Sequence, residues 1–350
     1  MVFPDGRRLN SAMLGAKIML HAHLRGTHYA MGYDWGHSLA WKGHLILEHT
    51  PLAPDKARVA YAAACLPIYE KHFPAVLAEM RGFADGQGCD TEEIAAVLWS
   101  MYALPPARAC SCFAVKTPEG ALLGRNSDFF TAMEAWNTNV LCAPADGGYA
   151  FTGNTTAFIE MEDGANERGL AVGLTSAPAR AIAPGMNAGM LLRRILETCA
   201  TVREALAFLK SAPIGSAQTL TLADARGEIA VVECDALGMA VVRPQPGQPW
   251  VCATNAFHDL PATPPPDGDD WFAQQRYETL VSALRESTPA DAAGAQALLA
   301  GRRGVLCQYD RAEGRDTVWS VVYDLGRREI FRAEGNPARI PFERDHRFAL

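Results

Sequence analysis

The sequence lacks a long apolar run, a surplus of basic residues, a regular cysteine spacing and an internal repeat. No apolar stretch reaches the roughly 20 residues that a membrane-spanning helix needs. The formal net charge is −7 and the basic residues are not clustered, so the sequence has no basic patch that would bind nucleic acid. The first residues, Met1 to Arg8, lack the apolar centre of a signal peptide. These absences indicate a globular cytoplasmic protein whose partners include neither membrane nor nucleic acid.

The nine cysteines are odd in number and show no pairing pattern, which is typical of reduced thiols in a cytoplasmic protein. Most of them are interpreted as packing residues: Cys65, Cys89, Cys142, Cys199, Cys234, Cys252 and Cys307. The remaining two, Cys110 and Cys112, lie in the stretch that carries most of the chemical information.

That stretch is predicted to be a β-hairpin. Residues 111–116 and 121–124 have strand patterns, and Pro118-Glu119-Gly120 between them is a turn sequence. Proline presets one turn dihedral, and glycine accepts a positive φ. In an antiparallel pair, the start of the first strand faces the end of the second. The hairpin therefore brings polar groups of its second strand to the start of its first strand.

The polar groups in question are Arg125 and Asp128, which we expect close to Cys110. A cation near a thiol lowers the pKa of that thiol and favours the reactive thiolate. This arrangement makes Cys110 a candidate nucleophile.

The same stretch resembles the start of the mature chain in the N-terminal-nucleophile amide hydrolases. The most similar branches are the acyl-coenzyme A:6-aminopenicillanic acid acyltransferase-like family and the choloylglycine (bile-salt) hydrolases. The matching residues are Cys110, Gly120, Gly124, Arg125, Asn126, Asp128 and Phe129. The resemblance extends from about residue 24 to about residue 334. It implies a four-layer αββα sandwich of two antiparallel sheets with a helical N-terminal leader.

The order of predicted elements by itself indicates layered α+β packing without choosing among α+β folds. Before the hairpin we expect helices that begin near Asp55 and at Asp90, the first broken by Pro67 and Pro74. After it we expect strands at 149–152, 157–161, 170–175, 218–223, 229–234, 239–243, 251–254, 317–324 and 329–333. The expected helices are 186–199, 201–211, 269–287 and 289–300.

The resemblance also implies that residues 1–109 are a leader and residues 110–350 the catalytic domain. The family cuts itself before its nucleophile, so we expect cleavage between Ala109 and Cys110, after a proline-containing joint at 105–108. The freed α-amine of Cys110, with an ordinary pKa of about 7.7–8.0, would then serve as the catalytic base. The two fragments are expected to remain associated.

The remaining site residues follow from the resemblance. Asp128 would orient the α-amine or Arg125. Asn255, after an apolar strand, resembles the family asparagine that holds the oxyanion and, with Arg125, should support self-cleavage. Thr175 stands where bile-salt hydrolases carry asparagine and would offer its backbone N–H to the oxyanion. Arg276 matches a late arginine that braces the site.

Each of these residues also has a plainer interpretation. Cys110 could be a packing cysteine, or half of a metal site with Cys112 and the His21-x-His23 pair. Arg125 and Asp128 could form a surface ion pair. In the same way, Asn255 suits a turn and Arg276 suits a solvated helix face. We expect no metal and no cofactor.

Three functions follow. The first is a cysteine amidohydrolase that cleaves a linear, non-peptide C–N bond of a small N-acyl compound through a thioester. The second is an acyltransferase that moves an acyl group between a coenzyme A thioester and an amine. The third is a non-catalytic thiol or metal-binding protein. The sequence leaves the acyl group, the amine and any homo-oligomer open.

Overall fold

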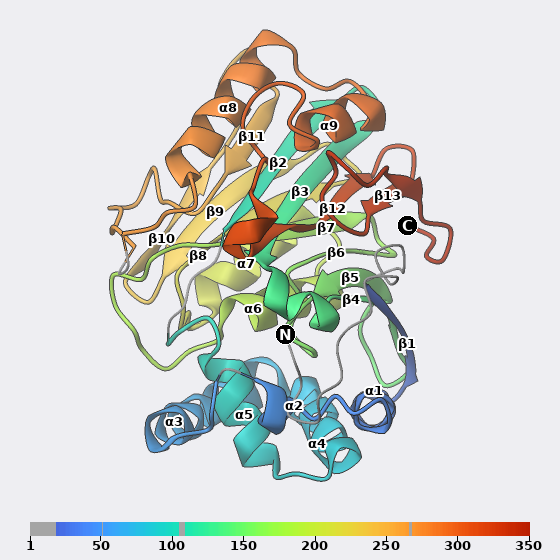
Figure 1. Cartoon of the computed structure of the whole chain (residues 1–350), viewed down its shortest axis with the longest axis vertical. Coiled ribbons are helices and arrows are strands. Elements are labelled where there is room, and N and C mark those ends of the chain that lie inside the picture. The colour runs from blue at the N-terminus through green and yellow to red at the C-terminus, as the bar shows by residue number, and fades with distance from the viewer. Residues whose placement is uncertain (1–18, 51, 105–108, 266–267) are drawn as a thin grey trace.

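The computed structural model describes residues 19–50, 52–104, 109–265 and 268–350 (Figure 1). The segment from Met1 to Arg8 and the joint at 105–108, both used in the sequence predictions, lie outside these ranges. Within the described ranges, none of the helices has the length and apolar character that crossing a bilayer requires.

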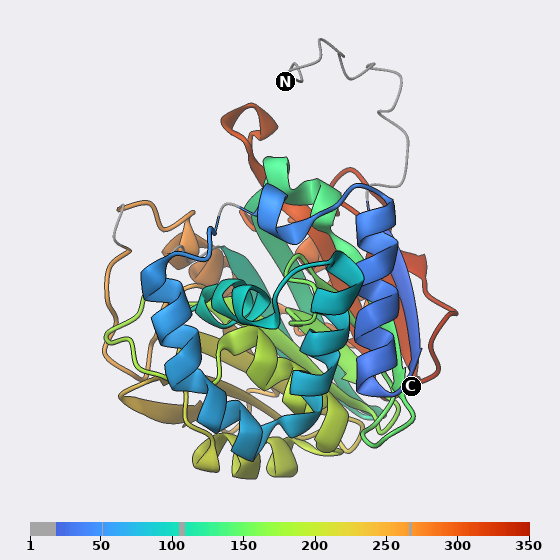
Figure 2. The same ribbon diagram turned by 90° about the horizontal axis from the view of Figure 1, so that it is seen from below.

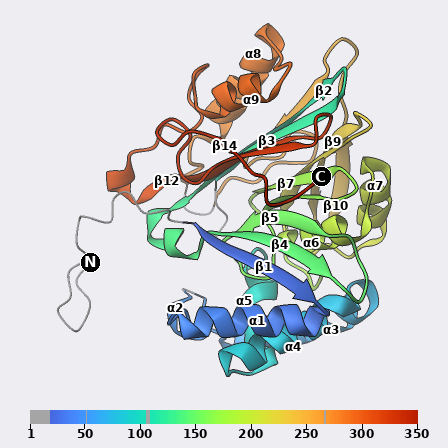
Figure 3. The same cartoon turned by 90° about the vertical axis from the view of Figure 1, so that its right-hand side faces the viewer.

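Two β-sheets form the centre of the structure (Figure 3). The eight-stranded sheet contains, in spatial order, β1 (Leu20–Gly26), β4 (Thr138–Pro144), β5 (Phe151–Thr155), β6 (Asp163–Asn166), β7 (Leu170–Ser176), β8 (Gln218–Asp224), β9 (Ile229–Asp235) and β10 (Gly238–Val242). The six-stranded sheet contains β11 (Trp250–Ala253), β2 (Cys110–Thr117), β3 (Gly120–Phe130), β12 (Arg315–Asp324), β13 (Glu329–Ala333) and β14 (Glu343–Arg344).

The facing sheets share a core of small side chains. Cys112 and Leu123 from one sheet pack with Ala171 and Val231 from the other. Because successive side chains of a strand point to opposite faces, Phe113 instead points outward to the next layer. The alternation of β2 thus assigns its cysteines to the face between the sheets.

Helices cover both outer faces. Next to the six-stranded sheet lie α8 (Ala273–Glu286) and α9 (Ala292–Leu299), while α6 (Ala188–Thr198) and α7 (Val202–Ser211) cover the eight-stranded sheet. Short 3-10 helices, η2 (Thr131–Trp136) and η3 (Arg311–Glu313), flank β3 and β12. The structure therefore confirms the predicted α+β, αββα layering.

The segment before β2, here called the leader, adds helices beyond α6 (Figure 2). They are α1 (His28–Trp41), α2 (Ile46–His49), α3 (Lys56–His72), α4 (Pro74–Gln87) and α5 (Thr91–Ser100). As predicted, a helix begins after Asp55, whose side chain caps Arg58 N–H at 2.9 Å, and the chain breaks at Pro74. Pro67 lies inside α3, and Asp90 precedes α5 without a side-chain capping bond.

The expectation of two purely antiparallel sheets needs one correction. Strand β1, from the leader, pairs in parallel with β4, whereas the other strand pairs of the described residues are antiparallel. A parallel pair needs a long crossover connection, and here the connection runs through α1 to α5 and the β2–β3 hairpin. In the described part of the leader, the helices are thus accompanied by one strand, β1, which forms the edge of the larger sheet.

A second correction concerns residues 157–161, which form a turn instead of a strand. Phe158 has a φ of 59°, in the left-handed region that a strand residue does not adopt. The strand that follows is β6, and its buried Asp163 and Asn166 gave no apolar pattern in the sequence. The other predicted strands and helices after the hairpin are present, with boundaries shifted by a few residues.

Candidate active site

Cys110 is the first residue of β2 and lies at the open end of the predicted hairpin. In the β2–β3 register, Cys110 faces Ser127 and Cys112 faces Arg125. The Arg125 side chain reaches along this face, and its Nη2 lies 3.0 Å from Cys110 Sγ. The hairpin therefore brings the thiol and the guanidinium together, as its sequence predicted.

Arg125 is completely buried and held on several sides. Its Nε donates to the Leu174 carbonyl oxygen at 2.8 Å, and its Nη1 donates to Asp163 Oδ2 at 2.9 Å. Glu162 Oε2 lies 3.4 Å from Nη2. The guanidinium also lies over the Trp319 ring, 5.6 Å from its centroid. A buried cation requires such partners, and together they fix the guanidinium next to the thiol.

Burial has the largest effect on the pKa of the Cys110 thiol. It raises the pKa of Cys110 to about 11, while the positive charge of Arg125 acts in the opposite direction and Glu162 and Asp128 add to the increase. The expectation that Arg125 lowers this pKa is therefore right for its own contribution and wrong for the net result. At neutral pH the thiol is therefore protonated, and an attack by its sulfur would need a base.

Asp128 is also completely buried, and its partners differ from those expected. It accepts hydrogen bonds from Thr317 Oγ1 at 2.6 Å and Tyr309 Oη at 2.9 Å. Its ion-pair partner is Arg276, with an Nη1–Oδ2 distance of 3.6 Å. Burial raises the pKa of Asp128 to about 6, opposed by Arg276 and the two hydroxyl donors. Asp128 does not orient Arg125 directly, and burial excludes a surface ion pair between the two.

Asn255 and Arg276 form hydrogen bonds with the backbone of Cys110. Asn255 Oδ1 accepts from the Cys110 N–H at 2.8 Å and from Arg276 Nη2 at 2.8 Å. Arg276 Nη1 donates to the Cys110 carbonyl oxygen at 2.5 Å and to Ser111 Oγ at 2.8 Å. Arg276 is only 1% exposed, which excludes a solvated helix arginine. The Asn255 amide Nδ2 donates to the Ser176 carbonyl oxygen at 2.8 Å.

An unusual backbone at the start of α8 positions Arg276. Trp271 and Phe272 have φ values of 51° and 58°, which residues other than glycine seldom adopt. The turned Trp271 carbonyl oxygen accepts from Arg276 Nε at 3.0 Å. Strained backbone of this kind is concentrated at functional sites.

Ala109, the residue before Cys110, is also held in place. Ala109 is buried in an apolar cluster with Trp271 and Tyr309. Its carbonyl oxygen accepts a hydrogen bond from the Asp128 N–H at 3.0 Å. The peptide bond between Ala109 and Cys110 is therefore fixed on both sides.

Thr175 lies one residue beyond Leu174 on β7, and its hydroxyl is already engaged. The hydroxyl donates to the Thr254 carbonyl oxygen at 2.5 Å and lies 2.6 Å from Thr219 Oγ1. The side chain thus supports the residue before Asn255 and does not contact Cys110. A backbone contribution of Thr175 to an oxyanion stays a prediction.

Cys110 and Arg125 form part of the wall of a cavity of about 580 Å³. Residues of the leader form another part of the wall, and most of the lining is apolar or aromatic. Its apolar and aromatic residues include Leu52, Met101, Tyr102, Phe129, Phe130, Trp136, Phe158 and Leu174. A volume of this size suits a small-molecule substrate with an apolar body.

Sequence reasoning missed Glu162 and Asp163, the carboxylates that hold Arg125. Adjacent acidic residues just before a strand could have been a signal, because carboxylates are seldom fully buried without a partner. Their pairing with Arg125 depends on how the two sheets stack, and no local pattern encodes that.

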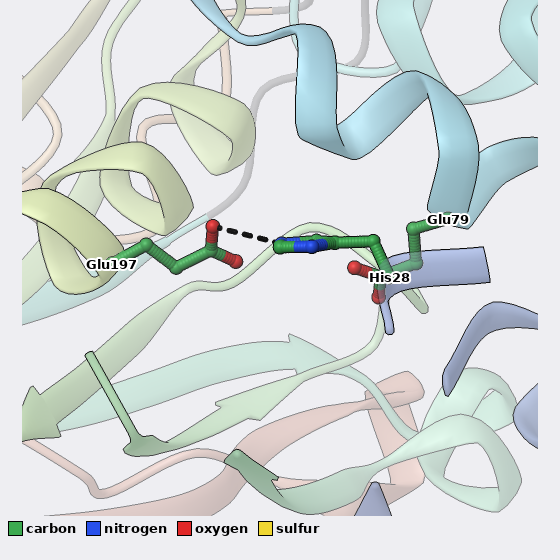
Figure 4. Close-up of side chains that lie close together, drawn as sticks. All are labelled: His28, Glu79 and Glu197. Atoms are coloured by element: carbon green, nitrogen blue, oxygen red, sulfur yellow. Dashed lines mark hydrogen bonds and ion pairs between the residues drawn. The ribbon is translucent and has the colours of Figure 1, made fainter. Parts of the chain in front are cut away.

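Another buried charged cluster lies between the leader and α6 (Figure 4). His28, Glu79 and Glu197 have potential ligand atoms within 4.8 Å of one another. Arg193 already supplies a cation there, with Nη2 2.6 Å from Glu79 and Nε 2.6 Å from Glu197. His28 Nδ1 lies 2.7 Å from Asp146 Oδ1. This donor set suits an ion-pair network better than a metal ion.

The metal site left open by the sequence is not assembled. Of the residues that the structure describes, no group of three or more potential ligands includes Cys110, Cys112, His21 or His23. His21 Nε2 instead lies 2.9 Å from Glu334 Oε1.

Comparison with known proteins supplies evidence on the family. The family model described as acyl-coenzyme A:6-aminopenicillanic acid acyl-transferase matches residues 115–339. This range contains Arg125, Asp128, Asn255 and Arg276 and begins after Cys110. No curated protein sequence matches the chain.

Several solved structures are similar. A Caenorhabditis elegans ortholog of N-acylethanolamine-hydrolyzing acid amidase is 18% identical, with a TM-score of 0.47 over 62% of this chain and 93% of that chain. Penicillin V acylase from Agrobacterium tumefaciens is 16% identical, with a TM-score of 0.41 over 64% of this chain and 82% of that chain. A mutant of conjugated bile acid hydrolase from Clostridium perfringens is 14% identical, with a TM-score of 0.43 over 68% and 97%.

Proposed function

This chain belongs to the acyl-coenzyme A:6-aminopenicillanic acid acyl-transferase family, and we propose that it is a cysteine-nucleophile amidohydrolase. Its substrate is a small N-acyl compound with a linear amide bond. The observation that carries the proposal is the Cys110 thiol, 3.0 Å from a buried guanidinium, in the wall of a largely apolar cavity. This arrangement combines a nucleophile, a charge that favours its anion and room for an acyl group.

The reaction has two halves. The Cys110 sulfur attacks the amide carbonyl, its proton passes to the departing nitrogen, and a thioester and a free amine form. Water then hydrolyses the thioester to the acid and regenerates the thiol. Asn255 lies beside the reacting residue and is a candidate donor to the oxyanion if its amide turns from the Ser176 carbonyl.

The base is the α-amine of Cys110, which self-cleavage would release. In that step the thiol attacks the Ala109 carbonyl, its proton passes to the Cys110 nitrogen, and water hydrolyses the thioester. The Asp128 N–H, 3.0 Å from the Ala109 oxygen, is suited to stabilise the oxyanion. Asn255 Oδ1 accepts from the Cys110 N–H and would hold the new amine. Arg125 would favour the attacking thiolate.

Acyl transfer is the second candidate, favoured by the description of the matched family. It uses the same thioester, which forms from an acyl-coenzyme A or an amide and reacts with an amine in place of water. The two activities share the Cys110 thioester and differ in its acceptor, and transfer can also take its acyl group from acyl-coenzyme A.

The test is a substrate screen with N-acyl amino acids, penicillins, acyl lactones and conjugated bile salts. Release of amine and acid in equal amounts indicates hydrolysis. Transfer of the acyl group to an added amine, or formation of a new amide from acyl-coenzyme A and an amine, indicates acyl transfer. Cys110→Ala is the matched inactive control. The third function, a non-catalytic thiol or metal-binding protein, would be favoured by three results. These are no turnover of any substrate class, metal bound to the purified protein, or a Cys110 that does not react with thiol reagents.

A further inference from the structure

The charged residues that line the cavity are unequally paired. Of the described residues, four with charged side chains lie in its wall. Arg125 and Glu162 lie 3.4 Å apart, and Glu313 lies 2.8 Å from Arg315. Three of the four charges are thus compensated by the protein itself.

The fourth is Arg58, in the first turn of α3. Its half-buried guanidinium donates from Nη1 to Ser100 Oγ at 2.6 Å. Ser100 Oγ in turn donates to the Ala96 carbonyl oxygen at 2.6 Å, so it is a neutral acceptor for Arg58. No carboxylate within the described ranges forms an ion pair with this guanidinium, and most of its N–H donors remain open.

We propose that Arg58 is a specificity-determining residue that binds a carboxylate of the substrate. This inference rests on the proposed function of Cys110. A guanidinium presents a planar fork of donors that matches a carboxylate, and the charged hydrogen bonds are short and strong. The substrate would place its reacting carbonyl at Cys110, its apolar body along the aromatic lining and its carboxylate at Arg58.

The surroundings of Arg58 favour this role over a loose surface charge. Leu52 and Met101 line the same cavity, and such apolar walls reduce the solvation that competes with an ion pair. Ser100 on α5 is fully buried and fixes one side of the guanidinium. The cation is therefore oriented before a ligand arrives, which lowers the entropic cost of binding.

The experiment uses two matched substrate pairs. N-phenylacetylglycine and its glycinamide analogue differ by a carboxylate on the amine side. The monobenzylamide of adipic acid and its methyl ester differ by a carboxylate on the acyl side. Wild-type protein should prefer the acid of one pair by about tenfold to a hundredfold in kcat/KM, the range of charged hydrogen bonds. The pair that shows the preference identifies the side that carries the carboxylate.

Arg58→Gln should abolish that preference through a higher KM for the acid, and Arg58→Lys should retain part of it. Arg81→Gln, an exposed arginine on α4, is the matched control and should keep the full preference. Equal turnover of acid and neutral analogue by wild-type protein would overturn the inference. So would a preference that survives in a folded Arg58→Gln protein.

A binding measurement separates this inference from the proposed function. The acid should raise the melting temperature of Cys110→Ala protein more than its neutral analogue does, and Arg58→Gln in the same background should remove the difference. If wild-type protein turns over neither pair while this difference is present, the proposed function fails and the carboxylate site stands. If binding shows no difference, the carboxylate site fails.

Discussion

At the scale of single residues, burial sets the chemical state of the site. It raises the pKa of the Cys110 thiol to about 11, so this thiol is neutral at pH 7. The 3.0 Å contact with Arg125 lowers the cost of forming the thiolate without making it the resting state. Activation therefore requires a base, and the proposed self-cleavage would supply one in the free α-amine of Cys110.

The two cysteines of β2 should respond differently to mutation. Cys110→Ala should abolish turnover with little change in stability, because it removes the reacting atom at the cavity wall. Cys112→Ala should keep most activity and lose about 1 kcal/mol of unfolding free energy, because Cys112 packs in the core between the sheets. Steady-state kinetics and thermal melts measure both effects. The opposite result would mean that Cys112 is the nucleophile.

Asp128 should give the pH–rate profile an acid limb near pH 6. Burial raises its pKa to about 6, so below this pH the carboxyl becomes neutral and loses its interaction with Arg276. Tyr309→Phe removes a hydrogen bond that lowers this pKa, so the limb should move to higher pH. The measurement is kcat/KM from pH 4 to 9 for both proteins. A limb that stays in place would assign it to another group.

At the scale of elements, local and distant contacts differ in how well the sequence predicts them. The hairpin of β2 and β3 was predictable because its turn and its alternation are local. The start of α7 is set locally in the same way, because the Thr201 side chain accepts from the Glu204 N–H at 3.2 Å. The pairing of Arg125 with Asp163 was not predictable, because it joins two sheets whose stacking no short pattern encodes.

The leader strand β1 and the turn at Phe158 were missed for related reasons. β1 does alternate apolar and polar residues, and Leu20, Ala22 and Leu24 pack on the core, but the strand is short and its partner β4 lies more than a hundred residues away. Phe158 adopts a backbone conformation that its own side chain disfavours, so only the surrounding packing selects it. The resemblance thus predicted the layers and the hairpin pattern predicted the contact of Cys110 with Arg125, but neither predicted β1 or the turn at Phe158.

Helices α1 and α4 give an element-scale prediction, because their backbones touch at glycines. A Cβ on Gly82 would lie 2.0 Å from the Tyr29 carbonyl oxygen, and one on Gly32 would lie 1.9 Å from the Glu79 carbonyl oxygen. Helix propensity alone would make Gly82→Ala stabilising by about 1 kcal/mol. The clash should reverse the sign and cost about 1–3 kcal/mol in denaturant unfolding.

Gly294 in α9 is the matched control, because a Cβ there would meet only atoms at ordinary contact distances of 3.4 Å or more. Gly294→Ala should be neutral or slightly stabilising. A stabilising Gly82→Ala would contradict the close helix contact.

At the scale of the whole molecule, a buried charge network joins the leader to the rest of the chain. Burial lowers the pKa of His28, but Glu197 and Glu79 outweigh it, and the net pKa is raised. Arg193 works against this increase, and Asp146 accepts at the other ring nitrogen. A raised pKa in the folded state means stabilisation that is present below the unfolded value of about 6.5 and is lost as pH rises through the folded value.

His28→Gln should therefore lower the unfolding free energy more at pH 5.5 than at pH 8.5. Chemical denaturation at the two pH values measures the difference. His37→Gln, an exposed histidine on the same helix, should have little effect at either pH. An equal loss from His28→Gln at both pH values would show that its packing, not its charge, holds the leader.

The leader should stay bound after self-cleavage between Ala109 and Cys110. Its departure would expose a core that contains Tyr69, Trp99 and residues of α6, and it would remove β1 from the larger sheet. It would also leave Arg193 without Glu79, and breaking a buried ion pair costs about 3–5 kcal/mol.

Wild-type protein should therefore elute from a sizing column in 1 M salt as one complex of two fragments. Their summed mass should exceed that of the intact chain by one water, and Cys110→Ala should stay full length. A leader that elutes separately would contradict the association, whereas an active protein with only the full-length mass would contradict the cleavage and leave Cys110 needing another base.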